Sequence, residues 1–195
     1  MTSLEDKDRV VLLKLARSVI TSELSEDKSL IPKPRDVSSV LMQKRGCFVT
    51  LHKSGALRGC IGTIEPRTAL YDCVAENAIN AAFRDPRFSP LDKNEIQAVD
   101  IEISVLTKPR ALQFTDGEDL KRQLVAGVHG VILSQGYRRS TFLPQVWEQL
   151  PKKETFLEHL CLKGGMSRSC WQQSNTCVEV YEAEYFSEKQ LLSKS

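Results

Sequence analysis

The chain has 195 residues, which is enough for one domain with a substantial hydrophobic core. Its composition is that of an ordinary globular protein, with 41% hydrophobic and 27% charged residues, and a net charge of +2 argues against nucleic acid or an anionic membrane as the main partner. The longest apolar run, residues 10–13, is far shorter than the roughly 18 residues that a membrane-spanning helix needs. Charged residues interrupt the N-terminal segment where a signal peptide would be apolar. We therefore expect a cytoplasmic protein that does not associate with a membrane.

The first predicted element is a helix over residues 2–24, where apolar residues recur at helical spacing. Thr2 with Glu5 fits a capping box at its start. Residues 31–46 contain two prolines and are predicted to form a connector.

A β-hairpin is predicted over residues 47–64, because two β-rich runs flank Ser54 and Gly55. Pro66 suits the first turn of a following helix, which must end near Asp85 because a proline comes next. Residues 98–106 alternate between apolar and polar side chains and predict a strand.

The second half continues with helices and strands that do not alternate regularly. We predict a short helix with a capping box formed by Thr115 and Glu118, then a hairpin turning near Gly136. A helix over residues 154–163 and one final strand over residues 176–186 complete the chain. This order predicts the α+β class, with a mixed or antiparallel sheet covered by helices.

Six cysteines are present, and in a cytoplasmic protein we expect them to be reduced. No C-x-x-C pair occurs, and the nearest histidine pairing is His159-x-Cys161, so we predict no metal site. Because free cysteine is often buried in cores, a functional role for any one of them needs a specific argument.

The segment LRGCIG, residues 57–62, provides such an argument. In a regular strand Leu57 and Ile61 would face the core, and Arg58 and Cys60 would share the opposite face. A guanidinium beside a cysteine favours the thiolate form, so this face predicts a reactive thiol. The alternative is a buried and inert Cys60.

Glycines flank this cysteine on both sides. Gly59 and Gly62 weaken a strand interior, and such glycines often mark a bulge or the close approach of another backbone or a ligand. We therefore interpret them as candidate ligand-binding positions.

Two residues elsewhere are candidates for proton transfer. Glu102 lies on the polar face of the strand predicted over residues 98–106 and would be near Arg58 if the two strands share a sheet. His129 stands among small residues at a predicted strand start, and its imidazole suits proton transfer near neutral pH. A solvated sheet face and a structural histidine are the alternatives.

Three cationic residues are candidates for binding an anionic group. Arg84 and Lys163 each lie near a helix C-terminus, where the macrodipole alone would favour them. Arg87 has no such explanation and suits a carboxylate or phosphate. An exposed salt bridge is the alternative for all three.

Six segments in order resemble the AMMECR domain family: LRGCIG, AAFRDPRFSPL, DIEISVL, GVHGV, TFLPQVW and FLEHLCLKGG. The resemblance is strongest over residues 35–187 and implies a stand-alone, microbial-type member forming a single domain over residues 1–195. It also implies two unequal lobes with LRGCIG beside the cleft between them. Its matching positions include Arg58, Cys60 and His129, and one departure is Gly164, where many members have alanine.

The family resemblance implies neither a settled activity nor a particular cofactor. Some microbial members are encoded beside Memo-like and radical-SAM proteins, which implies a functional association with them. Two hypotheses follow: a thiol-dependent enzyme that acts on a small anionic substrate or modifies a partner, and a non-catalytic ligand- or protein-binding adaptor that uses the same cleft. In the enzyme, Cys60 would be the nucleophile with Arg58, His129 and Glu102 assisting.

Overall fold

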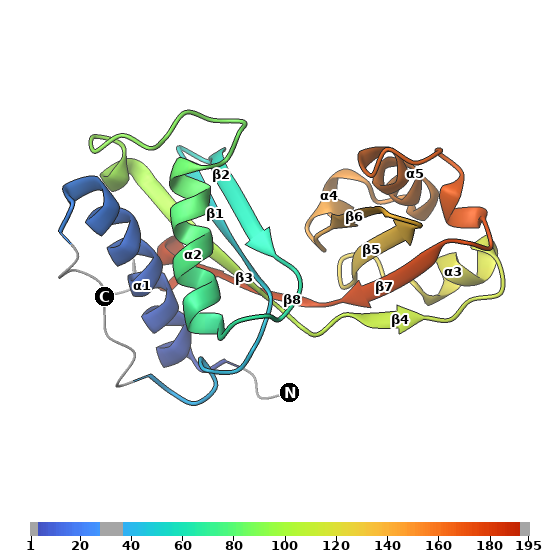
Figure 1. Cartoon of the computed structure of the whole chain (residues 1–195), viewed down its shortest axis with the longest axis horizontal. Coiled ribbons are helices and arrows are strands. Elements are labelled where there is room, and N and C mark those ends of the chain that lie inside the picture. Colours follow the sequence, from blue (N-terminus) through green and yellow to red (C-terminus); the bar gives the residue numbers. More distant parts are fainter. Residues whose placement is uncertain (1–3, 28–36, 192–195) are drawn as a thin grey trace. The chain divides into compact units, whose positions relative to one another are not determined.

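The computed structural model describes residues 4–27 and 37–191 and divides the chain into two compact units (Figure 1). Unit 1 comprises Met1–Leu106 with Glu184–Ser195, and unit 2 comprises Thr107–Ala183. The α+β class is confirmed, because helices accompany a four-stranded sheet in each unit. The single domain over residues 1–195, with two lobes and a cleft, stays a prediction.

Unit 1 is a sheet with helices packed on one face. The bounds are α1 Asp6–Ser25, β1 Cys47–Lys53, β2 Ala56–Thr63, α2 Leu70–Phe83, the short 3-10 helix η3 Ile96–Ala98, β3 Val99–Leu106, β8 Ala183–Ser187 and α6 Glu188–Leu191. The strand order is β2-β1-β3-β8, and β1 pairs antiparallel with both β2 and β3. Helix α2 packs on β1 and β2, and α1 packs on α2 and β3.

The core of unit 1 lies between this sheet and the two long helices. Leu12, Leu15 and Ile20 on α1 are fully buried, as are Val49 and Ile103 on the sheet. The alternation predicted for β3 is confirmed, since its odd-numbered apolar residues are all buried. One face of the sheet is thus committed to the core, and the other face is left for polar side chains.

Unit 2 has a second sheet of order β4-β7-β5-β6, in which β4 pairs with β7, β7 with β5 and β5 with β6, all antiparallel. Its core is rich in aromatic rings: Trp147 stacks on Phe156 with centroids 3.6 Å apart, and Phe142 meets Phe156 edge-on. The bounds are β4 Arg110–Leu112, α3 Gly117–Gln123, β5 Gly130–Gln135, β6 Arg138–Phe142, α4 Val146–Gln149, α5 Lys153–Lys163, the 3-10 helix η4 Cys170–Gln172 and β7 Cys177–Tyr181.

A disulfide joins Cys161 and Cys170 in unit 2, so the expectation of six reduced cysteines is wrong. The tight turn after α5 brings η4 back against the end of that helix, with the two Cα atoms 6.2 Å apart. This is within the range that a disulfide spans, and sequence spacing alone gave no sign of it.

Both capping boxes were predicted at the wrong residues. Helix α1 begins at Asp6, and its box joins Glu5 to Asp8; Thr2 lies outside the described residues. Helix α3 begins after Asp116, whose side chain accepts a hydrogen bond from the Asp119 amide. Carboxylates therefore cap both helices, as acidic residues near a helix N-terminus commonly do.

Two further boundaries differ from the prediction. Helix α2 begins at Leu70, so Pro66 lies in the preceding turn and not in the helix. Residues 176–186 form two strands in different sheets, β7 in unit 2 and β8 in unit 1. They separate at Glu182, whose backbone bonds Thr107. No helix among the described residues is long and apolar enough to cross a membrane.

Candidate thiol site in unit 1

Cys60 lies on β2, the edge strand of the unit 1 sheet, on the face away from α1 and α2. Its cross-strand neighbour on β1 is Thr50, whose hydroxyl donates a hydrogen bond to Cys60 Sγ at 3.4 Å. Thr50 in turn pairs with Glu102 on β3. Cys60, Thr50 and Glu102 therefore form one row across three strands, with the half-buried thiol at its outer end.

The strand alternation predicted for residues 57–62 is broken by an irregularity in the register. Leu51 pairs with Gly59, but the next residue, His52, pairs with Leu57, so Arg58 is the extra residue of a β-bulge. Leu57 consequently leaves the core face and is 42% exposed, which corrects its predicted burial. Ile61 packs against the core as predicted.

The bulge directs Arg58 toward the loop after α2 and not toward Cys60. Its guanidinium binds both carboxylate oxygens of Glu95, at 3.2 and 2.8 Å, and the carbonyl oxygens of Ser89 and Pro90. Lys53 binds the same carboxylate. Hydrogen bonds from Arg58 and Lys53 hold the pKa of Glu95 well below its usual range. The predicted pairing of Arg58 with the thiol is therefore wrong.

The motif RDPRF supplies the contacts that the edge of β2 lacks. The Cys60 amide donates to Asp85 Oδ2 at 2.8 Å, and the Cys60 carbonyl oxygen accepts from Arg87 Nη2 at 3.2 Å. Arg87 also forms a two-point ion pair with Asp85, through Nε at 2.9 Å and Nη2 at 2.7 Å. We call Asp85 and Arg87 the edge clamp, because they satisfy the outward-facing backbone of Cys60 where a neighbouring strand would otherwise pair.

The charges of the edge clamp place the Arg87 guanidinium beside the Cys60 thiol. The hydrogen bonds from Arg87, with those from the amides of Cys60 and Arg87, hold the pKa of Asp85 well below its usual range. The pKa of Arg87 is raised, mainly by Asp85 and also by the Cys60 thiol beside it. Asp85 is 1% exposed at its side chain while Arg87 is 54% exposed. A buried carboxylate thus fixes an accessible guanidinium next to Cys60.

Both glycines of LRGCIG are required by packing against other parts of unit 1. A Cβ on Gly59 would lie 2.2 Å from the carbonyl oxygen of Ala81 on α2. A Cβ on Gly62 would lie 2.2 Å from the ring of Phe48. The close approach that the sequence predicted is therefore made by a helix backbone and an aromatic ring.

His52 is a neighbour of the thiol that sequence reasoning missed. It lies two residues from Thr50 on β1, so it shares the thiol's sheet face and stands diagonally across from Cys60. Its cross-strand partner on β3 is Asp100. The available signal was period-two alternation along β1, which places Thr50 and His52 on one face.

The structure places the other predicted proton-transfer residue, His129, in unit 2. It is buried, its Nδ1 accepts a hydrogen bond from the Val125 amide at 3.1 Å, and its carbonyl oxygen accepts from Trp147 Nε1. Burial, aided by the positive charge of Arg110, lowers the pKa of His129. The imidazole of His129 is therefore neutral, and it binds the backbone of the loop that precedes β5.

The remaining cationic candidates have local partners. Lys163 in unit 2 donates to the Thr141 carbonyl oxygen at 2.8 Å and lies 5.0 Å from the centre of the Phe142 ring. Arg84 is exposed at the end of α2 and donates to Asn80 Oδ1 one turn earlier. Among residues 4–27 and 37–191, no group of three or more histidine, cysteine or acidic side chains is placed to hold a metal ion.

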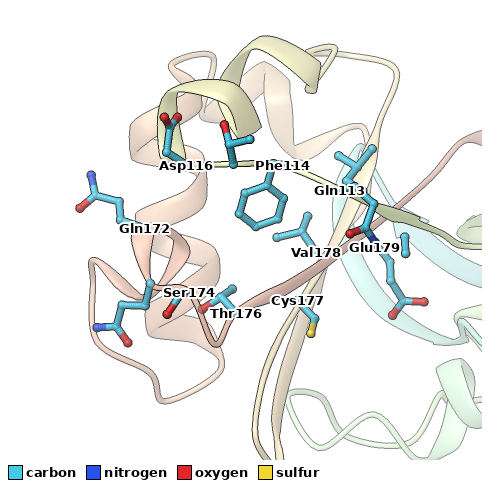
Figure 2. A pocket seen from close by; sticks show the side chains of 13 residues that line it. Gln113, Phe114, Asp116, Gln172, Ser174, Thr176, Cys177, Val178 and Glu179 are labelled. Atoms are coloured by element: carbon cyan, nitrogen blue, oxygen red, sulfur yellow. The ribbon is translucent and has the colours of Figure 1, made fainter.

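Unit 2 contains a cavity of about 590 Å³ where β4 and β7 diverge (Figure 2). Its wall combines the apolar side chains of Phe114 and Val178 with carboxamides such as Gln113 and Gln172, and Cys177 lies at its edge. Two acidic residues and no lysine or arginine line it. The complete lining is residues 111–116, 172–174 and 176–179.

Comparison with known proteins identifies the family. The AMMECR1 family model matches residues 13–186, which span both units. The protein Mbar_A1807 of Methanosarcina barkeri is 39% identical over 96% of this chain and 93% of its own length. A protein of Methanothermobacter thermautotrophicus is 40% identical over 91% of this chain and 92% of its own length.

The crystal structure of the uncharacterised protein PH0010 from Pyrococcus horikoshii has the same fold. It superimposes with a TM-score of 0.89 at 34% identity, covering 97% of this chain and 95% of that one. Sequence and structure agree over nearly the whole length of the chain. The protein belongs to the AMMECR1 family.

Proposed function

We propose that the protein is a thiol-dependent enzyme in which Cys60 is the nucleophile or covalent carrier. The observation that carries this proposal is the edge clamp, in which buried Asp85 holds the exposed guanidinium of Arg87 beside the thiol. A fixed guanidinium suits a carboxylate or phosphate group, so the substrate would be a small anion or an anionic group on a partner.

The neighbouring residues have distinct roles in this proposal. Thr50 orients the sulfur through its donated hydrogen bond. Glu102 and His52 lie on the same sheet face and are the candidates for moving a proton once substrate fills the space beside the thiol. Arg58 is a positioning residue. Its hydrogen bonds to the Ser89 carbonyl oxygen and to Glu95 hold the loop that follows the edge clamp in the chain.

The wider setting follows from the family resemblance. A pathway shared with Memo-like and radical-SAM proteins, in the cytoplasm, is part of this proposal. Arg84, His129 and Lys163 are left outside the thiol chemistry, since the contacts within their own units account for them.

Two alkylating agents of nearly equal size test the thiol and its guanidinium together. Iodoacetate is anionic and iodoacetamide is neutral. The alkylation rate with iodoacetate divided by the rate with iodoacetamide therefore reports the charge around each cysteine. We expect the ratio at Cys60 to exceed that at exposed Cys177 several-fold, because the cavity beside Cys177 has acidic and no basic lining residues. Arg87→Gln should remove this preference at Cys60 and leave Cys177 unchanged.

Equal ratios at the two cysteines, or an Arg87→Gln protein that keeps the preference, would contradict the proposed site. Folding of the variant is checked by circular dichroism, and its Cys177 rates serve as the internal control. A second experiment incubates the protein with a small-molecule cell extract and records intact mass. An adduct that is absent from Cys60→Ser would support a covalent role and define the ligand by its mass.

A non-catalytic binding module is the second candidate, and the cavity in unit 2 favours it. Its volume suits a small molecule, and its carboxamides, two carboxylates and lack of lining cations suit a ligand rich in hydrogen-bond donors. In a genetic complementation assay, a module of this kind predicts that Cys60→Ser keeps full function while Gln113→Ala loses it. The thiol enzyme predicts the opposite result for Cys60→Ser.

A further inference from the structure

Two other cysteines of unit 1 lie in contact inside its core. Cys47 is the first residue of β1 and Cys73 lies on α2, and their sulfur atoms are 3.0 Å apart. Both are buried, at 0% and 3% exposure. This distance is below the contact distance of two unbonded sulfur atoms, so the fold already holds the pair close to bonding geometry.

The surroundings of the pair are built around the two sulfurs. The Asn77 side-chain amide, one turn along α2 from Cys73, is directed at Cys47 Sγ at 3.5 Å and at Cys73 Sγ at 3.3 Å. It also bonds the Cys47 carbonyl oxygen, and Asn77 itself is buried. Because Asn77 fixes both the helix and the strand, the two thiols cannot drift apart without breaking a buried polar contact.

We infer that Cys47 and Cys73 are a disulfide-forming pair that cross-links α2 to the sheet when the protein meets a small peroxide. The pair is separate from the proposed catalytic thiol. Cys47 and its neighbours Val49 and Leu51 face the helices, whereas Cys60 lies on the opposite face of the same sheet. Oxidation of this pair and alkylation of Cys60 are therefore independent events.

The chemistry requires one oxidant molecule. The Cys73 sulfur attacks hydrogen peroxide, breaks its O–O bond and becomes a sulfenic acid, with release of water. The Cys47 sulfur then displaces the hydroxyl group to form the S–S bond, and a second water leaves. Two thiols are oxidised by two electrons in total, and one peroxide is reduced to two waters.

The environment assigns the first step to Cys73. It is the more exposed of the two thiols, and the hydrogen bond that Cys47 donates to it lowers its pKa. Burial raises the pKa of Cys47, which keeps that residue a thiol until the sulfenic acid forms beside it.

Peptide mapping tests the inference on the full chain. The folded protein is treated with hydrogen peroxide, denatured, alkylated without reductant and digested with trypsin. Cys47, Cys60 and Cys73 fall in separate peptides, residues 46–53, 59–67 and 68–84. We expect peptides 46–53 and 68–84 to appear joined, two hydrogen masses below their sum, while peptide 59–67 does not join either of them.

Two variants provide the controls. Cys60→Ser should leave the cross-link yield unchanged, because Cys60 is not a relay in this chemistry. Cys73→Ser should abolish it and leave Cys47 alkylated. Recovery of peptides 46–53 and 68–84 singly from oxidised wild-type protein would overturn the inference, as would a cross-link between either of them and peptide 59–67. These readouts do not depend on the anion preference of Cys60, so the two proposals fail separately.

Discussion

The two units are stabilised by different kinds of interaction. Unit 1 buries aliphatic residues of two long helices against one face of its sheet. Unit 2 has shorter helices and relies on stacked aromatic rings, with a disulfide joining α5 to η4. A small unit buries a smaller share of its surface, and cross-links and aromatic side chains are usual compensations.

The polar groups also differ between the units. In unit 1 the charged residues 85, 87 and 95 hold the edge strand that carries Cys60, and the free pair Cys47 and Cys73 lies in the core. In unit 2 the buried polar residues are Ser140, Thr176 and His129, and the imidazole of His129 is neutral. Unit 1 therefore depends on carboxylates that must stay ionised, whereas unit 2 depends on an imidazole that must stay neutral.

The largest expected effect is that of Gly59→Ala in unit 1. The added methyl group would meet the Ala81 carbonyl oxygen at 2.2 Å, so β2 and α2 must move apart. We expect unit 1 to lose about 3 kcal/mol of unfolding free energy, measured by urea denaturation. Gly136→Ala in unit 2 is the matched control, because its Cβ meets nothing within 4 Å and its cost is only the strain of φ +60, about 1 kcal/mol. Equal costs would mean that α2 does not pack on Gly59 as described.

Removal of the disulfide should affect unit 2 selectively. A Cys161→Ala, Cys170→Ala double variant opens a loop with a sequence separation of 9, and the chain-entropy model gives a loss of roughly 2.5 kcal/mol. Hydrogen exchange resolved by peptide should show faster exchange in residues 107–183 only. Faster exchange spread equally over both units would show that their stabilities are coupled, against the separate cores described above.

Asp85→Asn tests the edge clamp, and its effect depends on pH. The variant keeps the shape of the side chain but loses the charge that binds Arg87 and the Cys60 amide. We expect a loss of about 2 kcal/mol near pH 7. Because the pKa of Asp85 is lowered in the folded state, its stabilisation is complete above the unfolded pKa, about 3.9, and disappears as the pH falls through the folded value.

The measurement is a set of urea unfolding curves of both proteins between pH 7 and pH 3. The difference between them should stay constant down to about pH 5 and shrink below pH 4. A constant difference at every pH would assign the loss to shape and not to the charge.

The sequence was sufficient for most elements, because hydrophobic periodicity determines them. The hairpin at Ser54, the strand at residues 99–106 and the helix at Phe156 are all confirmed. The boundary at Glu182 was not predictable in this way, because both strands beside it carry apolar residues and only long-range pairing assigns them to different sheets.

The predicted contact between Arg58 and the Cys60 thiol was wrong for a physical reason. Alternation assumed a regular strand, whereas the bulge at Arg58 redirects that arginine to Glu95. The guanidinium beside Cys60 comes from Arg87, 27 residues further along the chain, which only the fold brings near. Local periodicity carries no information on such a contact.

The smallest expected effect concerns His129, whose contribution to stability is lost at a higher pH than that of the carboxylates of unit 1. Its pKa is lowered in the folded state, so neutral His129 contributes stability that is complete above the unfolded pKa, about 6.5, and is lost as the pH falls through the folded value. We expect exchange in residues 107–183 to accelerate modestly between pH 7 and pH 5, after correction for intrinsic rates, while unit 1 is unchanged over that range.

His129→Asn is the control for this prediction, since its side-chain amide group retains an acceptor for the Val125 amide but does not titrate. The variant should be less stable than wild type at pH 7 and should lose the dependence on pH. If the acceleration in unit 2 persists in the variant, another group is responsible. If unit 1 responds over the same pH range, the carboxylate of its edge clamp does not determine its stability in acid. The two units thus differ in a property that one pH titration separates: the imidazole of unit 2 takes up its proton at a higher pH than the one at which the carboxylates of unit 1 lose their charge.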